Sequence, residues 1–406
     1  MNSKLSCALL LGLLLLTSCA ADDVHIEQAE TQIATPTVRV ATFNVSMDGS
    51  NYVKDFTKLS ESPLPELLAE GTNEQIHNIA QIIQTVRPDI ILLNEFDYTQ
   101  DWQRNVELFK ANFLSKAHGS AKAIDYPYAY SAPSNTGISS KFDFDGNGKK
   151  TGNAGDAYGF GFYPGQYAMV LLSRYPIDAD SVRTFQHLKW HTQENAVMPM
   201  LEGQPFYDQQ TWHAAKLSSK SFWDIPVRIG EHTLHVLASH PTPPVFDGPE
   251  DRNGLRNIAE IKLVADYITE NSPSYLIDDK GVQGGLAPQS RFVVVGDLNA
   301  APEGEKARPE AINHLLEHPL VNATVPPASA GGAASEDAQY AKYYTASWRA
   351  RADYVLPSKA GLEIVDAGVF WPHIQDEGYE LVKDRTLSSD HRLVWMDLKL
   401  IAHGGN

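Results

Sequence analysis

Two polar residues follow a short apolar run late in the chain. Phe292–Val295 is β-branched and aromatic and ends at Gly296, a pattern that indicates a buried central strand. Asp297 and Asn299 come next, and side chains two positions apart on an extended chain point the same way. A carboxylate and an amide therefore leave one strand end together, where open α/β sheets carry their sites. The same pattern also suits a turn or a cap without a chemical role.

Other predicted strands end in polar side chains too. They are Asn44 after Val38–Phe43, Glu95 after Ile90–Leu93, and His240 after Leu234–Ala238. Two later segments add Asp353, and Asp390 with His391. Taken singly, a glutamate after a strand is most often a solvated loop residue, and a lone histidine is most often structural. The order of these residues along the chain is therefore more informative than any one of them.

That order carries a resemblance to a known family. The motifs are Phe-Asn44, Asn-Glu95-Phe, Ser173-Arg-Tyr-Pro-Ile177, Ser-His240-Pro, Gly-Asp297-Leu-Asn299, Asp353-Tyr and Ser-Asp390-His391. From about residue 38 to 400 they resemble the endonuclease/exonuclease/phosphatase superfamily. The stretches Leu217–Asp224 and Ser239–Asn253 resemble a secreted bacterial branch of it. The resemblance implies a four-layer α-β-β-α sandwich of two packed mixed β-sheets with helices on the outer faces. It also implies metal-dependent hydrolysis of a phosphoester.

The resemblance further assigns roles to individual residues. Glu95 and Asn44 would hold Mg²⁺ or Mn²⁺, with Asp390 nearby, and such ions prefer oxygen ligands. Asp297 would orient or deprotonate the attacking water, and Asn299 would bind a phosphate oxygen. His391 would contact the phosphoryl group, and Asp353 would orient the His391 ring. His240 would protonate the leaving group as general acid. Which histidine donates the proton, and which carboxylate accepts one, stays open.

Two cations near the His240 segment are candidate substrate ligands. Lys220 and Arg252 are placed to contact a substrate phosphate, and arginine binds phosphate through a bidentate fork. The alternative is that both are solvated surface charges.

A second candidate metal site precedes a glycine- and aromatic-rich stretch. Asp143, Asp145 and Asn147 alternate like the first half of a calcium loop, and Gly148 falls at its turn. Ala154 stands where such a loop needs a glutamate, and Asp156 lies just beyond. A structural Ca²⁺ and a glycine-rich surface hairpin both fit this pattern.

The elements that must position these residues alternate between strand and helix. Apolar spacing predicts helices at 73–86, where Thr72 and Gln75 suit a capping box, and at 255–268. Further strands are predicted at Ala168–Leu172, Ile225–Ile229, Tyr354–Leu356 and Leu393–Leu400, and a surface loop at Pro326–Ser335. The interleaving indicates an α/β fold, and residues 37–402 read as one catalytic domain.

The N-terminus indicates export. Residues 1–18 have a positive Lys4 and an apolar run too short to span a bilayer, as in a signal peptide. Leu16–Cys19 resembles a bacterial lipobox, so we expect lipidation at Cys19, with residues 19–36 as a tether. The expected location is the outer membrane, the cell surface or the periplasm. The alternative is an ordinary secretory signal in which Cys19 has no role.

The charge composition limits the kinds of substrate that the chain is expected to bind. Asp and Glu number 50 against 33 Lys and Arg, so the chain offers no broad basic face for a nucleic-acid backbone. We therefore expect a monomeric, lipid-anchored phosphodiesterase or phosphatase. Nucleic acid is a less favoured substrate, as for an extracellular endo- or exonuclease of the same fold. A further alternative is a surface lipoprotein that kept the fold for binding alone.

Overall fold

Two β-sheets form the centre of the protein. The computed structural model describes residues 36–402. The first sheet has the order β12-β13-β1-β2-β4-β3 and the second β11-β10-β9-β8-β5, and both mix parallel and antiparallel pairs. The first contains β1 (Thr37–Met47), β2 (Ile90–Phe96), β3 (Tyr128–Tyr130), β4 (Met169–Ser173), β12 (Leu362–Val369) and β13 (Val394–Leu400). The second contains β5 (Arg183–Thr184), β8 (Trp223–Ile229), β9 (His232–Ala238), β10 (Phe292–Asp297) and β11 (Asp353–Pro357). A separate hairpin joins β6 (Met200–Leu201) to β7 (Gln204–Pro205).

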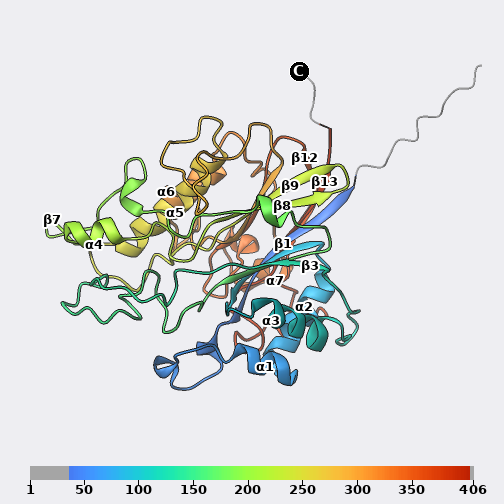
Figure 1. Ribbon diagram of the computed structural model, residues 1–406. Coiled ribbons are helices and arrows are strands. Elements are labelled where there is room, and N and C mark those ends of the chain that lie inside the picture. Colours follow the sequence, from blue (N-terminus) through green and yellow to red (C-terminus); the bar gives the residue numbers. More distant parts are fainter. Residues whose placement is uncertain (1–35, 403–406) are drawn as a thin grey trace, which may run out of the picture. The chain divides into compact units, whose positions relative to one another are not determined.

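Helices cover the outer faces of both sheets, as Figure 1 shows. Helices α1 (Leu64–Glu70), α2 (Glu74–Val86) and α3 (Trp102–Phe109) lie on the first sheet. Helices α5 (Arg252–Ile268) and α6 (Pro309–Leu316) lie on the second. The short α4 (Gln209–Ala214) and α7 (Ala330–Ser335) lie in connecting segments. The 3-10 turns are η1 (Gly49–Asn51), η2 (Phe56–Lys58), η4 (Ala179–Ser181), η5 (Trp190–Thr192), η6 (Ala341–Tyr343) and η7 (Tyr379–Leu381), and η3 (Lys110–Leu114) is a π-helical turn.

The layers follow from the alternation of side chains along each strand. In β10, Val293 and Val295 point into the core between the sheets, whereas Phe292 and Val294 pack against α5 and α6. Every side chain of this strand is buried, which is why it reads as an unbroken apolar run. The predicted four-layer sandwich is confirmed. No helix among residues 36–402 has the length and apolarity needed to cross a membrane.

Two local predictions were wrong. Helix α2 is capped by Asn73, whose side chain accepts from the Ile76 amide, and not by Thr72. Gln75 instead donates to the Val45 carbonyl, 2.9 Å away, and to the carbonyl of Ser388, so it ties the end of β1 to the His391 segment. These tertiary contacts outweigh the local capping box.

The predicted loop at Pro326–Ser335 is a helix over its second half. Ser329 caps α7 by accepting from the Gly332 amide at 3.0 Å. Gly331 lies against Trp371, where a Cβ atom would come within 2.5 Å of the Trp371 carbonyl oxygen. The glycine at position 331 in α7 therefore permits close packing against Trp371, and it does not mark a loop.

Gly296 sits at another close approach, next to Asp297. Its φ is +149°, and a Cβ atom there would lie 1.8 Å from the carbonyl oxygen of Ser239, the residue after β9. We expect Gly296→Ala to lower the free energy of unfolding by about 3 kcal/mol or more, because neither strand can move without breaking the core. Urea unfolding followed by tryptophan fluorescence measures it.

The matched control is Gly230→Ala, in the turn between β8 and β9. Gly230 has a φ of +60° and open space around it, so only the backbone conformation is penalised, by about 1 kcal/mol. Equal losses for the two variants would contradict the steric explanation.

Candidate active site

The polar strand ends meet at one edge of the two sheets. Strands β1 and β2 are parallel, as are β9 and β10, so each pair ends on the same side. Asn44 is paired with Asn94 across the first sheet, and Asp297 with Asp353 across the second. His391 precedes β13, which runs antiparallel to β1 and therefore starts at this edge.

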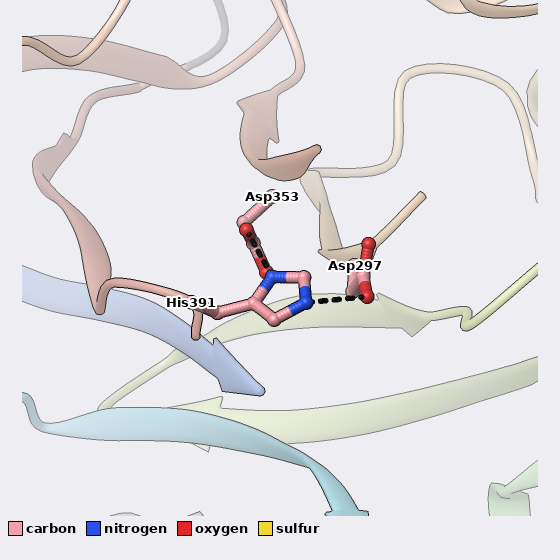
Figure 2. Close-up of side chains that lie close together, drawn as sticks. All are labelled: Asp297, Asp353 and His391. Atoms are coloured by element: carbon pink, nitrogen blue, oxygen red, sulfur yellow. Dashed lines mark hydrogen bonds and ion pairs between the residues drawn. The ribbon is translucent and has the colours of Figure 1, made fainter. Parts of the chain in front are cut away.

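Three buried titratable side chains form a line at the centre of this edge, shown in Figure 2. The Nδ1 atom of His391 lies 2.8 Å from Asp353 Oδ2, and its Nε2 atom lies 3.5 Å from Asp297 Oδ2. Thr345 donates its hydroxyl to the same Asp353 oxygen at 2.7 Å. The Asp353 carboxylate therefore fixes the ring of His391 and directs Nε2 at Asp297.

The charges of this line support one another. Burial disfavours the charged form of His391, but Asp353 and then Asp297 outweigh it and raise the pKa of the imidazole well above its ordinary value. Burial likewise opposes the ionised form of Asp297, yet His391 and His240 outweigh it and hold the pKa of that carboxyl well below its usual range. Near neutral pH the line thus contains an imidazolium beside an ionised Asp297.

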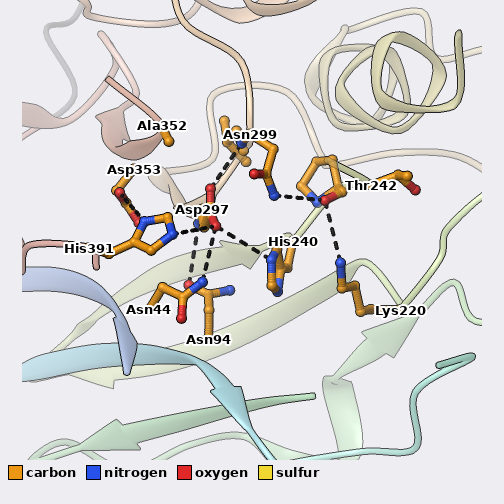
Figure 3. A network of polar contacts seen from close by, with 12 residues as sticks. Asn44, Asn94, Lys220, His240, Thr242, Asp297, Asn299, Ala352, Asp353 and His391 are labelled. Atoms are coloured by element: carbon orange, nitrogen blue, oxygen red, sulfur yellow. Dashed lines mark hydrogen bonds and ion pairs between the residues drawn. The ribbon is translucent and has the colours of Figure 1, made fainter. Parts of the chain in front are cut away.

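Asp297 is also the hub of the wider network in Figure 3. Its Oδ2 accepts from the Asn44 amide at 3.1 Å, and its backbone N–H donates to Asn94 Oδ1 at 3.3 Å. His240 Nε2 lies 3.5 Å from the same Oδ2, opposite His391. Three side chains from three segments therefore converge on this single carboxylate.

Asn299 and His240 flank this hub. Asn299 adopts a φ of +52° and donates its amide to the Pro241 carbonyl at 3.1 Å, which turns its carboxamide towards the cleft. Burial, and next the charge of Lys220, lower the pKa of His240 to about 4. The imidazole of His240 is therefore neutral near pH 7.

Two of the predicted metal ligands, Glu95 and Asp390, line the same cleft, and the third, Asn44, donates to Asp297 beside it. Asn44, Glu95 and Asp390 offer oxygen donors, the set that a hard divalent cation requires. Desolvation, and next the carboxylate of Asp48, raise the pKa of Glu95 to about 8. A cation would relieve this crowding of carboxylates, so the residues present fit the ion. Glu95 also has a φ of +61°, a strained conformation typical of functional positions.

Asp297, Asp353 and His391 form a further acidic cluster, since one ligand atom from each lies within 4.8 Å of the others. Both nitrogens of His391 already face carboxylates here. We therefore interpret this line as acid–base machinery next to the metal ligands rather than as the ligand set itself.

The two predicted substrate cations differ in their surroundings. Lys220 is only 5% exposed and borders the cleft. Arg252 also borders the cleft, but its guanidinium pairs with Glu250 and lies 5.7 Å from the centre of the Phe206 ring. Much of the charge of Arg252 is thus engaged within the protein. Substrate binding by either residue stays a prediction.

The predicted calcium loop brings its acidic side chains together. One carboxylate oxygen each from Asp143, Asp145 and Asp156 lies within 4.8 Å of the others. Asp143 accepts from the amides of Gly146 and Gly148 at 2.8 Å each. Asn147 donates its side chain to Asp145 rather than facing the other oxygens. The loop is thus closed by its own hydrogen bonds, and calcium binding stays a prediction.

Several residues of the site carry no signal in the sequence. Thr345 orients Asp353, and Trp348 packs edge-on against His391 with ring centres 4.5 Å apart. Asp48, which stands beside Glu95, lies in a turn four residues after Asn44. None of the three ends an apolar run. All three lie outside the strands, and only tertiary contacts bring them to the site.

A deep cleft of about 1240 Å³ opens over these residues. At one end it is bordered by Glu95, Asp297, Asp390 and His391. Away from them its lining is rich in aromatic side chains, among them Tyr158, Trp190 and Tyr207. Such a volume accommodates a small organic molecule.

Comparison with known proteins assigns the chain to a family. The chain belongs to the Endonuclease/Exonuclease/phosphatase family, whose model matches residues 41–391. This is a family of hydrolases that act on phosphoester bonds. No curated protein sequence matches the chain closely enough to count as a relative.

Three solved structures can be superimposed over most of the chain. An endonuclease/exonuclease/phosphatase from Beutenbergia cavernae is 16% identical, with 90% of this chain and 72% of that one covered at a TM-score of 0.48. The human Nocturnin catalytic domain with bound sulfate is 15% identical, with 90% and 95% covered at a TM-score of 0.43. Sphingomyelinase C from Streptomyces griseocarneus is 14% identical, with 89% and 99% covered at a TM-score of 0.41.

The His391–Asp353 pair should make stability depend on pH. An imidazole whose pKa rises on folding stabilises the fold fully below its ordinary pKa of about 6.5, and this contribution is lost as the pH rises through the folded-state value. In EDTA, Asp353→Asn should lower the free energy of unfolding by about 3 kcal/mol near pH 6. The difference from the wild type should narrow towards about pH 9. Urea titrations at the two pH values measure it.

Asp178→Asn serves as the control, because Asp178 forms an exposed ion pair with Arg228 and contacts no histidine. It should change stability little at either pH. A loss in Asp353→Asn that is equal at both pH values would show that the imidazolium does not contribute.

Proposed function

We propose that this protein is a divalent-metal-dependent phosphoester hydrolase, a phosphodiesterase or phosphatase, in which water attacks phosphorus. The observation that carries the proposal is the convergence of His391, Asn44 and His240 on the buried carboxylate of Asp297. Such a carboxylate has no packing role, and its neighbours leave an oxygen-rich face towards the cleft. Family membership supports the same chemistry.

Asp297 would orient the attacking water. Because its pKa is held low, the carboxylate is a strong acceptor of hydrogen bonds but a weak base. The imidazolium of His391 would stabilise the negative charge that builds up on the phosphoryl oxygens, and Asn299 would add an amide donor. Asp353 keeps His391 charged and in place, as the aspartate does in a serine-protease triad.

Asn44, Glu95 and Asp390 would hold Mg²⁺ or Mn²⁺. Bound there, the ion supplies neutralisation of the phosphoryl charge and lowers the pKa of a bound water. A phosphoester resists attack because its oxygens are anionic, so the carboxylates of this site need a cation before they can face a phosphate. This explains why an acidic pocket can serve an anionic substrate.

A small phosphoester suits the cleft better than a long nucleic acid. Several cations that border the cleft are already engaged: Arg252 with Glu250, Arg308 with Asp251, and Arg385 with Asp390. The remaining positive charge is too scattered to follow a polynucleotide backbone. The enclosed, aromatic part of the cleft instead favours a compact organic group on the ester.

Loss of Asp297 should remove most activity. Asp297→Ala, like Glu95→Ala and His391→Ala, should lower kcat/KM by on the order of 10²–10⁴ while the protein stays folded. Bis-p-nitrophenyl phosphate, p-nitrophenyl phosphate, plasmid DNA and RNA are assayed with Mg²⁺ or Mn²⁺, and EDTA should abolish turnover. The control Asp180→Ala removes an exposed carboxylate outside the cleft and should be fully active.

Turnover of Asp297→Ala at the wild-type rate would remove this mechanism. Turnover by the wild type that persists in EDTA would exclude a requirement for a divalent metal. Cleavage of plasmid DNA or RNA in strong preference to both nitrophenyl esters would make the protein a nuclease of the same fold.

We further propose that the protein is exported and anchored by a lipid at Cys19. The support is the signal-like sequence of residues 1–18 and the lipobox-like Leu16–Cys19, which lie outside the described residues. In a bacterial host, the wild type should fractionate with membranes and enter a detergent phase, and Cys19→Ser should not. Cys7→Ser, inside the predicted signal, is the control. Equal partitioning of all three proteins would exclude the anchor.

A further inference from the structure

Lys220 is a buried cation with almost no partner. Its ammonium group can donate three hydrogen bonds, yet the single one that it makes among residues 36–402 runs to the Pro241 carbonyl at 3.5 Å. Within the same part of the chain it forms no ion pair with a carboxylate, although the residue is only 5% exposed. A buried charge in this condition is costly, so its position needs an explanation beyond packing.

Its surroundings form a pocket of unused polar atoms. Within the described part of the chain, the buried hydroxyl of Thr242 and the buried Nδ1 atom of His240 have no hydrogen-bond partner. Lys220, His240 and Thr242 all border the cleft. The side of the cleft around Pro241 therefore presents donors, the ammonium group and the hydroxyl, that suit an oxygen-bearing group.

Glu260 holds this pocket in shape without neutralising it by contact. Its Oε1 atom accepts from the Ser219 amide at 2.6 Å, and its Oε2 atom accepts from the Thr242 amide at 2.6 Å. Because both oxygens are taken by backbone groups, Glu260 links the segment before β8 to the segment after β9. The ammonium of Lys220 is thus fixed between two anchored chains, as a preorganised charge requires.

The position of Lys220 relative to Asp297 suggests which oxygen it meets. Figure 3 shows Lys220 and His240 on one side of Asp297, and Asp353 with His391 on the other. In an in-line displacement the attacking and leaving oxygens lie on opposite sides of phosphorus. His240 is a poor candidate for the leaving oxygen, since a neutral imidazole has one N–H and Nε2 faces Asp297.

We propose that Lys220 donates to the leaving oxygen of the ester, a role that rests on the proposed hydrolase function. The water oxygen bonds to phosphorus while the bond from phosphorus to the leaving oxygen breaks, with its electron pair on that oxygen. A proton from the Lys220 ammonium converts the leaving oxygen to an alcohol. The proton lost by the water returns through solvent to the amine, so that ester and water give alcohol and phosphate.

Esters with different leaving groups test this role. The series has p-nitrophenyl, phenyl and methyl leaving groups, each as the monoester and as the methyl diester, with the wild type and Lys220→Met compared. The p-nitrophenolate ion leaves without help, whereas methoxide requires a proton. Lys220→Met should lose about 10-fold or less in kcat/KM on the nitrophenyl ester and on the order of 10³-fold on the methyl ester.

Lys216→Met is the matched control. Lys216 borders the same cleft, but it contacts His187 and the ring of Tyr158 instead of the Pro241 segment. Its replacement should change kcat/KM by one common factor for the esters of all three leaving groups. His240→Asn should likewise lower all three together, because its nitrogen faces Asp297.

Stability provides a second readout. If Lys220 is kept for catalysis, replacing an unpaired buried ammonium by methionine should leave the Tm unchanged or raise it. A structural lysine would lower the Tm when replaced. Lys220→Gln gives the same comparison should the methionine variant not fold.

The inference is overturned if Lys220→Met lowers kcat/KM by the same factor for every leaving group, or does not lower kcat/KM at all. It is equally overturned if His240→Asn, rather than Lys220→Met, shows the dependence on the leaving group. These outcomes leave the hydrolase intact. A wild type that turns over none of the esters with Mg²⁺ or Mn²⁺ would instead remove the proposed function itself.

Discussion

A carboxylate placed where almost no water reaches it is the constraint around which this structure is arranged. Asp297 is 1% exposed and is ionised only because an imidazolium, a second imidazole and an amide surround it. Each of these partners comes from a different segment, so the charge can be kept in this buried position only when both sheets are packed. The packing of the core between the sheets therefore also assembles the chemical groups at their edge.

Strained backbone accompanies this arrangement. Ser46, Glu95 and Asn299 have φ values between +48° and +61°, and all three lie at or just after the ends of central strands. Glycine would adopt these angles at lower cost, but it would bring no oxygen or amide to the edge. The packed sheets supply the free energy that holds the side chains in these conformations, as is typical of functional sites.

The buried charges also give the two histidines of the site different protonation states. His391 is charged because two carboxylates face it, and His240 is neutral because burial and Lys220 oppose its proton. Two histidines on one carboxylate thus have different charge states, set entirely by their neighbours. Glu260 and Thr345, which touch no part of the cleft chemistry directly, fix the positions of Lys220 and Asp353.

The sequence by itself determined the layers and most of the site. Continuous apolar runs such as Phe292–Val295 indicate buried strands, and the polar residues that follow a strand then lie at a sheet edge. Tertiary structure decided what no local pattern contains: the cap of α2 at Asn73, the helix at Ala330–Ser335, and the edge strand Leu362–Val369. It also brought Asp48 and Thr345 to the site and left the Lys220 ammonium with one long hydrogen bond among residues 36–402. These features depend on which distant segments share a sheet, because a contact across hundreds of residues leaves no periodic trace in either segment.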